Sequence, residues 1–298
     1  MSKTVYIIVG PTAIGKTALA IQLAKHLQTE IISADARQCY KELNIGVARP
    51  SIEELNQVPH HFIASHSIQE TVNASVFEHY ALSITEKLFE TKDNIVMVGG
   101  TGLYIKAFCE GLDDIPAIDP SVRQHILSSY ETNGLAWLQS EVAQKDPAYW
   151  EQAEQENPQR LMRALEVMEG LGKSILTFQC RQKKERPFKI VTIGMEMDRA
   201  LLYDRINLRV ESMIANGLEQ EVKNLLPYFS LNALQTVGYR EWLPYFNKEA
   251  SLKEVIASIQ QNTRHYAKRQ MTWFKKDATV QWFDANNTNL FNELLAII

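Results

Sequence analysis

The sequence predicts an α/β fold: a parallel β-sheet with helices on both faces and an inserted all-helical subdomain. Apolar runs at 5–9 and 95–98 each lead into a helical pattern, which is typical of strand–helix units. The strand pattern disappears over 113–187 and returns at 189–195. We therefore expect a helical domain, 113–187, inserted into a core formed by residues 1–112 and 188–298.

Composition excludes several classes of protein. A 298-residue chain with a net charge of −4 has no overall field that attracts nucleic acid, so such a partner needs a local basic surface. The three cysteines, Cys39, Cys109 and Cys180, are far apart, which argues against a disulfide framework or a zinc site and favours a reducing cytosol. No apolar run reaches eighteen residues and no signal peptide is evident, so we expect a cytoplasmic protein with no membrane partner. Nothing in the sequence suggests a large apolar interface, so we expect a monomer.

The first strand–helix unit carries a phosphate-binding loop. Residues 10–17 match G-x-x-x-x-G-K-T between the apolar run and a helix, which is the context that this loop requires and makes the fold P-loop NTPase-like. Inward-turned N–H groups, the helix N-terminus and Lys16 bind phosphate oxygens, and Thr17 can hold Mg²⁺. The predicted phosphate ligands are Gly10, Pro11, Thr12, Ala13, Ile14, Gly15, Lys16 and Thr17.

The next predicted strand ends on a carboxylate. Residues 30–35 form it, and Asp35 should share a crevice with the phosphate loop, because ligands bind at the carboxyl ends of parallel strands. His60 and His61 lie in a possible third strand, where adjacent side chains point to opposite faces, so they do not predict a metal site. A helical pattern at 76–89 predicts a covering helix.

The strand at 95–98 ends in Gly99, Gly100 and Thr101 rather than in the aspartate that helps to hold magnesium in P-loop ATPases and GTPases. The glycines permit close backbone approach, and Thr101 offers a hydroxyl and an N–H to a ligand. Thr101 can equally be the N-cap of the next helix, and the two interpretations are compatible.

Basic residues recur in the second half of the chain. In the insertion, Arg160 and Arg163 share one helix face, whereas the loop 181–186 is more typical of a solvated linker than of a binding patch. Arg205 and Arg209 are stacked one helical turn apart and can clamp a pyrophosphate. The alternative is a salt-bridged surface helix, in which the nearby Asp204 and Glu211 pair with these arginines.

The last third of the chain predicts a polar turn at 235–240 with an exposed Tyr239, a long amphipathic helix at 252–274 and a final strand at 280–283. The helix has an apolar stripe that includes Tyr266. No acidic residue interrupts its basic flank, which favours contact with a phosphate backbone. The basic residues on or beside this flank are Arg264, Lys268, Arg269, Lys275 and Lys276.

Six blocks, in order, resemble the tRNA dimethylallyltransferase (tRNA isopentenyltransferase) family over nearly the whole chain. They are Gly-Pro-Thr-Ala-x-Gly-Lys-Thr at 10–17, Ser-Ala-Asp-x-Arg-Gln at 33–38, Val-Gly-Gly-Thr-Gly-Leu-Tyr at 98–104, Asn-Pro-Gln-Arg-Leu-x-Arg-Ala-Leu-Glu at 157–166, Gln-Thr-x-Gly-Tyr-Arg-Glu at 235–241 and Thr-Arg-x-Tyr-Ala-Lys-Arg-Gln-x-Thr-Trp-Phe at 263–274. The departures are Ile14, Ala36 and Val47; the family's eukaryotic cysteine/histidine extension is absent, which suggests a bacterial type.

The resemblance implies transfer of a dimethylallyl group from its pyrophosphate to N6 of the adenosine 3′ of the anticodon. It implies a pyrophosphate ester in the phosphate loop, with Mg²⁺ on Thr17. It assigns catalysis to Asp35 as the base, Thr101 at the leaving group and Arg209 as its clamp, with Arg205 as second choice.

The resemblance also implies that the insertion and the core together grip the anticodon stem-loop of the tRNA. The basic helix lies on the same side in the family. The implied tRNA contacts are Asp35, Ala36, Arg37, Gln38, Arg123, Gln159, Arg160, Leu161, Met162, Arg163, Gln235, Thr236, Val237, Gly238, Tyr239 and Arg240, joined by Arg264, Lys268 and Arg269 of the basic helix.

The sequence is also compatible with three other functions. An ATP-dependent small-molecule kinase needs an arginine-rich lid, for which 181–186 is the candidate. A prenyltransferase acting on free AMP or ADP would not need the basic helix. An RNA-binding protein with a vestigial nucleotide site would not need Lys16, Thr17 and Asp35.

Overall fold

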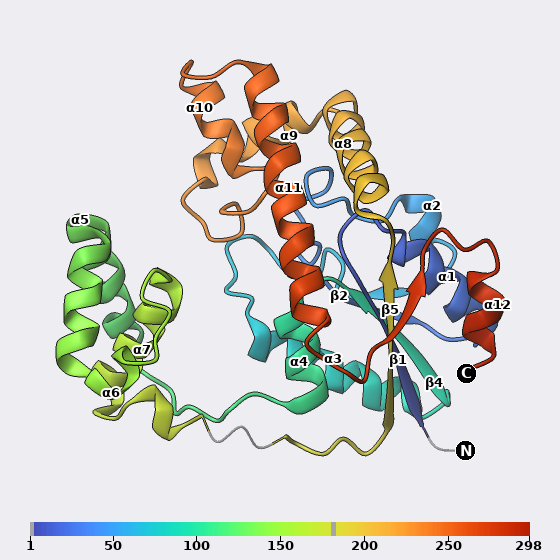
Figure 1. Cartoon of the computed structure of the whole chain (residues 1–298), viewed down its shortest axis with the longest axis horizontal. Helices are drawn as coiled ribbons and strands as arrows, with labels where there is room; N and C mark the ends of the chain where they lie inside the picture. The colour runs from blue at the N-terminus through green and yellow to red at the C-terminus, as the bar shows by residue number, and fades with distance from the viewer. Residues whose placement is uncertain (1–2, 180–182) are drawn as a thin grey trace. The chain divides into compact units, whose positions relative to one another are not determined.

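A parallel β-sheet forms the centre of the larger of the two units into which the chain divides (Figure 1). The computed structural model describes residues 3–179 and 183–298. One unit comprises Met1–Glu110 and Glu185–Ile298, and the other comprises Gly111–Lys184. Cys180 and the first two residues of the basic loop, Arg181 and Gln182, lie outside the described residues.

Within the described ranges the sheet has six strands in the order β3-β2-β4-β1-β5-β6, and every neighbouring pair is parallel. The predicted α/β fold is therefore confirmed. Strands β1 and β4 lie at the centre because their apolar runs are buried on both faces, as a parallel sheet between helices requires. The strands are β1 Thr4–Val9, β2 Ile31–Ala34, β3 His60–His61, β4 Asn94–Gly99, β5 Lys189–Glu196 and β6 Gln281–Asp284.

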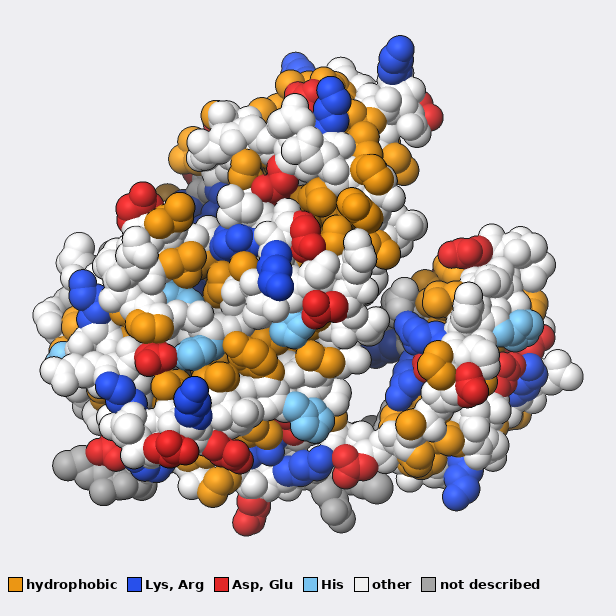
Figure 2. All heavy atoms as spheres, turned by 180° about the vertical axis from the view of Figure 1, so that it is seen from behind, with side chains coloured by type: hydrophobic (Ala, Val, Ile, Leu, Met, Phe, Trp, Pro, Cys, Tyr) orange, Lys and Arg blue, Asp and Glu red, His pale blue; other side chains and the backbone are white. Residues whose placement is uncertain are grey.

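Helices cover both faces of this sheet: α1 and α12 lie on one side, and α3 and α4 lie on the other (Figure 1). On the face of this unit that Figure 2 shows, Lys and Arg side chains are interspersed with Asp and Glu. The helices are α1 Lys16–His26, α2 Ile52–Leu55, α3 Ala74–Phe89, α4 Gly102–Glu110, α8 Arg199–Ala215, α9 Leu218–Leu225, α10 Leu243–Phe246, α11 Leu252–Phe274 and α12 Leu290–Leu295, with short 3₁₀ segments at Leu226–Tyr228 and Arg240–Trp242.

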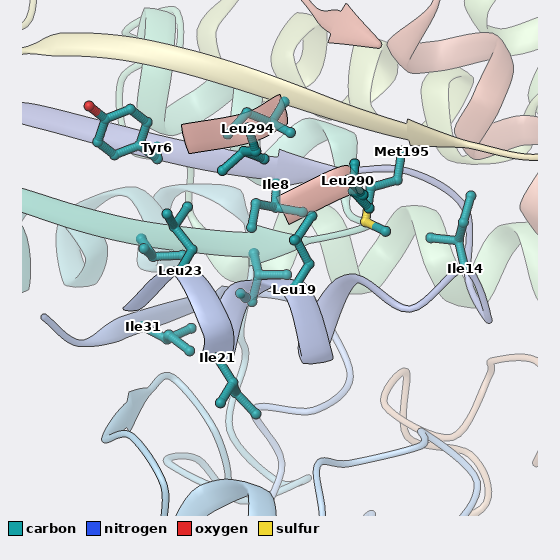
Figure 3. Packing of buried hydrophobic residues seen from close by; sticks show 14 of the residues in the cluster. Tyr6, Ile8, Ile14, Leu19, Ile21, Leu23, Ile31, Met195, Leu290 and Leu294 are labelled. Carbon is teal, nitrogen blue, oxygen red and sulfur yellow. The ribbon is translucent and has the colours of Figure 1, made fainter. Parts of the chain in front are cut away.

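The core between the sheet and α1 follows from strand alternation. Tyr6 and Ile8 of β1 point to the same face and pack against Leu23 of α1 and Leu294 of α12 (Figure 3). Burying one leucine side chain of this kind contributes about 2 kcal/mol. This layer holds β1 and α1 rigidly on either side of the loop that joins them.

The second unit is helical in its described part. Asp119 caps the start of α5, and Gly134, with φ +71°, divides α5 into two helices. The helix α7 ends at Gly172, whose φ is +65°. Its elements are α5 Pro120–Lys145, α6 Pro147–Trp150, α7 Pro158–Leu171 and a 3₁₀ turn at Ile175–Thr177. Across both units, no helix in the described ranges is long and apolar enough to span a bilayer.

Candidate active site

The loop between β1 and α1 wraps around a cavity of about 310 Å³, here called the phosphate cavity. Gly10 has φ +146° and Gly15 has φ +105°, where other residues are strained. Ala13 has φ +66° although it is not glycine. A Cβ at Gly10 would lie 2.7 Å from the Met195 carbonyl oxygen. The cavity is lined by Thr12–Ala18, Ser33, Asp35, Gln38, Val47–Pro50, Glu54, His60, Ile63, Val98–Gly100, Arg209, Tyr266 and Gln270.

Lys16 lies in this cavity as a cation short of negative partners. Its amino group donates to the Pro11 carbonyl oxygen at 2.7 Å. The residue as a whole is only partly buried, but its amino group has lost hydration. This loss and, secondarily, the charge of Arg209 lower the pKa of Lys16 to about 7, against the opposing charge of Asp35. A bound phosphate would supply the missing negative charge.

Arg205 and Arg209 both reach the phosphate loop from α8. Arg209 Nη1 lies 3.4 Å from the Thr12 hydroxyl, and Arg205 Nη1 lies 3.5 Å from the Ile14 carbonyl oxygen. Within the described chain neither guanidinium has a carboxylate at ion-pair distance. The alternative in which Asp204 and Glu211 pair with these arginines is therefore not observed. Burial, and then repulsion from Arg205, lower the pKa of Arg209, which lines the phosphate cavity.

Asp35 lies where the phosphate cavity meets a second one of about 260 Å³, here called the adjoining cavity. Its Oδ1 accepts from the N–H groups of Arg37 at 2.8 Å and Gln38 at 3.2 Å, so the turn after β2 fixes the carboxylate. Thr12, Asp35, Val47, Ala48, Arg209 and Tyr266 line both cavities. The adjoining cavity also has an apolar wall formed by Val210, Met213, Val237 and Ile259.

Thr101 joins the ends of β2 and β4. Its hydroxyl accepts from the Ala36 N–H at 3.0 Å, and its own N–H donates to the Ala34 carbonyl oxygen at 3.2 Å. The hydroxyl therefore lies at the turn that carries Asp35, and the side chain lines the adjoining cavity. Gly99 permits this approach, because a Cβ there would collide with the main chain of Ala34.

The turn at 235–240 differs from expectation in one respect. Tyr239 is fully buried, so the prediction that it is exposed is wrong. Its hydroxyl donates to Glu221 Oε1 at 2.6 Å, and Glu221 also accepts from the N–H groups of Ile45 and Gly46. Burial and the charge of Glu221 raise the pKa of Tyr239. The tyrosine is therefore a support for the loop 44–48 that lines the adjoining cavity.

Two lining residues on α11 were missed as functional residues. The sequence pattern places Tyr266 in the apolar stripe of α11, yet the residue lines both cavities, and burial with the charge of Asp35 raises its pKa to about 12. Gln270, one turn further on, is buried and binds the phosphate loop. Polar side chains four residues apart in an otherwise apolar stripe were the available signal.

The basic flank of α11 is only partly free of partners. Arg264 donates to Asn207 Oδ1 at 2.7 Å, and Lys275 pairs with Glu196 at 2.7 Å. The remaining cations lie with an aromatic ring in an open hollow, here called the α11 hollow. It is lined by His265, Lys268, Arg269, Thr272, Trp273 and Lys276.

The candidates in the helical unit form their own cluster. Arg123 and Arg163 both pair with Glu166, at 2.8 and 3.1 Å, and Arg160 pairs with Glu154 at 2.6 Å. Gln159 is exposed, whereas the side chains of Leu161 and Met162 are buried in the core of the unit. Because these two side chains are packed inside, any tRNA contact of Leu161 and Met162 would involve their main chain.

Comparisons with known proteins agree with this geometry. Residues 38–277 match the family model described as IPP transferase. The chain is 47% identical to a tRNA dimethylallyltransferase of Christiangramia forsetii, over 98% of this chain and 97% of that one, and 45% identical to that of Flavobacterium johnsoniae, over 98% and 96%.

Solved structures give the same result. A tRNA isopentenylpyrophosphate transferase of Bacillus halodurans is 34% identical with a TM-score of 0.72, covering 100% of this chain and 94% of that chain. A eukaryotic dimethylallyltransferase acting on tRNA has a TM-score of 0.81 at 25% identity, covering 99% of this chain and 78% of that one. On these grounds the chain belongs to the tRNA dimethylallyltransferase (IPP transferase) family.

Proposed function

We propose that this chain transfers a dimethylallyl group from dimethylallyl pyrophosphate to N6 of the adenosine 3′-adjacent to the anticodon in tRNA, and releases pyrophosphate. The observation that carries the proposal is the junction of the two cavities. There a carboxylate, Asp35, lies between a cationic phosphate loop and a second cavity with an apolar wall. Relatives named tRNA dimethylallyltransferase support it.

Different residues at the junction stabilise the leaving group and accept the proton. The pyrophosphate lies in the phosphate cavity, where Lys16 and Arg209 stabilise the negative charge that develops as the allylic C–O bond breaks. The N6 lone pair forms the new C–N bond, and the proton lost from N6 passes to the carboxylate of Asp35. The electron pair of the C–O bond leaves with pyrophosphate.

Magnesium fits the phosphate cavity as a proposed cofactor. Thr17 and Ser33 line the cavity with hydroxyls, and the buried Nε2 of the lining His60 lacks a hydrogen-bond partner in the described chain. No cluster of three acidic, histidine or cysteine side chains suited to a metal occurs among the described residues. Mg²⁺ is usually held by few protein groups together with phosphate oxygens and waters, so Thr17 would hold it, and it would neutralise the leaving group.

In the larger unit, the proposed tRNA contacts are the Asp35–Gln38 turn, the 235–240 turn and the α11 hollow; in the helical unit, they are Arg123, Arg160 and Arg163. The first two line or border the adjoining cavity, into which the adenine must turn out of its stack. We propose that the protein acts as a monomer.

The function is tested by incubating the protein with labelled dimethylallyl pyrophosphate, Mg²⁺ and either tRNA or AMP. Label should appear on the tRNA adenosine 3′ of the anticodon. Label on AMP alone would identify the enzyme as a prenyltransferase of free nucleotides, and absence of label on either acceptor would contradict the proposal.

Arg209 should matter more for donor binding than Arg205. Arg209 lines the phosphate cavity, whereas Arg205 holds the outside of the loop at Ile14. We expect Arg209→Gln to raise the Kd for pyrophosphate about 30-fold or more, the loss typical of removing one member of a buried charge pair. Arg205→Gln is the matched variant one turn away. Equal effects in calorimetry would contradict the ranking.

The α11 hollow should contribute to tRNA binding through its charge. Lys268 and Lys276 are exposed and line the hollow, whereas Arg264 is engaged with Asn207. We expect Lys268→Glu with Lys276→Glu to weaken tRNA binding and to make the slope of log K against log salt shallower by about 2. Lys253→Glu, exposed at the start of the same helix, is the control. A slope equal to that of the wild type would show that the hollow does not bind tRNA.

A further inference from the structure

We propose that Gln270 is a positioning residue that holds the phosphate loop in its binding shape, by tying the loop through both ends of one carboxamide to the turn after β4. The proposal deepens the proposed function and rests on it for the identity of the donor.

The two hydrogen bonds are direct and sheltered. Gln270 Oε1 accepts from the Thr12 N–H at 2.8 Å, and Gln270 Nε2 donates to the Gly100 carbonyl oxygen at 3.0 Å. The residue is 6% exposed. A Cβ at Gly100 would collide with Nε2, so the glycine at this position is needed to admit the amide. One side chain of α11 thus joins two walls of the phosphate cavity, which Gln270 itself also lines.

The peptide that Gln270 holds is the one on which the loop depends. Thr12 precedes Ala13, which has φ +66°, a conformation that non-glycine residues seldom adopt. The Thr12 hydroxyl also lies 3.4 Å from Arg209 Nη1. Fixing the Thr12 peptide therefore fixes both the curvature of the loop and the place of its clamp. Without Gln270 the Thr12 N–H loses its acceptor, and the loop can relax away from the conformation that turns its N–H groups to phosphate.

The chemistry of the amide makes the role testable. It needs one acceptor toward Thr12 and one donor toward Gly100. In Gln270→Glu, an ionised carboxylate keeps the acceptor but places an oxygen against the Gly100 carbonyl, whereas a protonated carboxyl group provides one donor and one acceptor, as the amide does. Because an ionised glutamate in the phosphate cavity would also repel pyrophosphate, the uncharged Gln270→Met variant measures the loss of the two hydrogen bonds alone.

The experiment measures pyrophosphate binding by calorimetry, and donor KM and kcat with tRNA, between pH 5.5 and 8. We expect Gln270→Met to raise the Kd for pyrophosphate at least tenfold throughout. Gln270→Glu should show an equally large loss of pyrophosphate affinity at pH 8. At pH 5.5 it should recover most of that affinity, compared with the wild type at the same pH. Dividing by the wild-type value removes the titration of the ligand for both variants and, for the uncharged Gln270→Met, that of Lys16.

Two control variants on the same helix distinguish a specific effect of residue 270 on pyrophosphate binding from a general loss of protein stability. Gln261→Met changes an exposed glutamine, and Val255→Ala removes buried methyl groups and should lower the Tm; both should leave the Kd within twofold of the wild type. The proposal is overturned if Gln270→Met also stays within twofold. If that variant does not fold, a Gln270→Glu variant that fails to recover at low pH overturns it. A wild type that binds pyrophosphate but prenylates no tRNA would contradict the proposed function. The Kd values of the variants would still test the role of Gln270 in that case.

Discussion

Asp35→Asn is expected to lower kcat by about two to four orders of magnitude while pyrophosphate binding is largely retained. An exocyclic amine shares its lone pair with the purine ring, so its attack depends on a base that removes the N6 proton as the bond forms. Asparagine is the informative replacement, because its Oδ1 can still accept from the Arg37 and Gln38 N–H groups. Asp35→Ala would remove those two bonds and disturb the turn itself.

Pyrophosphate binding to Asp35→Asn should be measured near pH 6. The charge of Asp35 supports the protonated form of Lys16, so its removal lowers the pKa of Lys16 further, and at pH 8 a loss of affinity would come from the lysine. Asp198→Asn is a matched control, because Asp198 also accepts from main-chain N–H groups but caps α8 outside both cavities. A rate for Asp35→Asn within threefold of the wild type would show that another group takes the proton.

The parts of this site that the sequence predicts are those built from consecutive residues. The phosphate loop depends on glycines at fixed spacing between a strand and a helix, and Asp35 depends on the rule that parallel strands end at one edge. The helical repeat places Arg205 and Arg209 on one face, but the preference for Arg209 rests on the family resemblance; in the structure Arg209 is the one that lines the phosphate cavity.

The parts that the sequence did not predict depend on chain segments that meet only in the fold. Gln270 binds Thr12 across 258 residues, and Tyr239 is buried because Glu221, on another helix, accepts from it. An exposed and a buried tyrosine look alike in a polar turn, since periodicity is absent there. The free and engaged cations of α11 also looked alike, because Asn207 and Glu196 come from distant elements.

Lys16→Met is expected to abolish useful donor binding, raising the Kd for pyrophosphate by on the order of 100-fold or more, because the buried charge pair with phosphate is lost. The same variant should make the ligand-free protein no less stable. The folded pKa of Lys16, about 7, lies below its ordinary value of 10.5, so burial works against the ammonium. Between those values the unfolded chain binds more protons, and the stability contributed at this position rises with pH over that window.

The depressed pKa also predicts how donor affinity changes with pH. Phosphate charge favours the ammonium, so above about pH 7 the free enzyme must take up a proton to bind, and affinity should fall by up to tenfold per pH unit. Lys16→Arg keeps its charge throughout, so its affinity should follow only the titration of the ligand. The difference between the two slopes from pH 6 to 9, measured by calorimetry, isolates Lys16. Parallel slopes would show that Lys16 is already charged in the free protein, and that the phosphate cavity compensates its cation without a ligand.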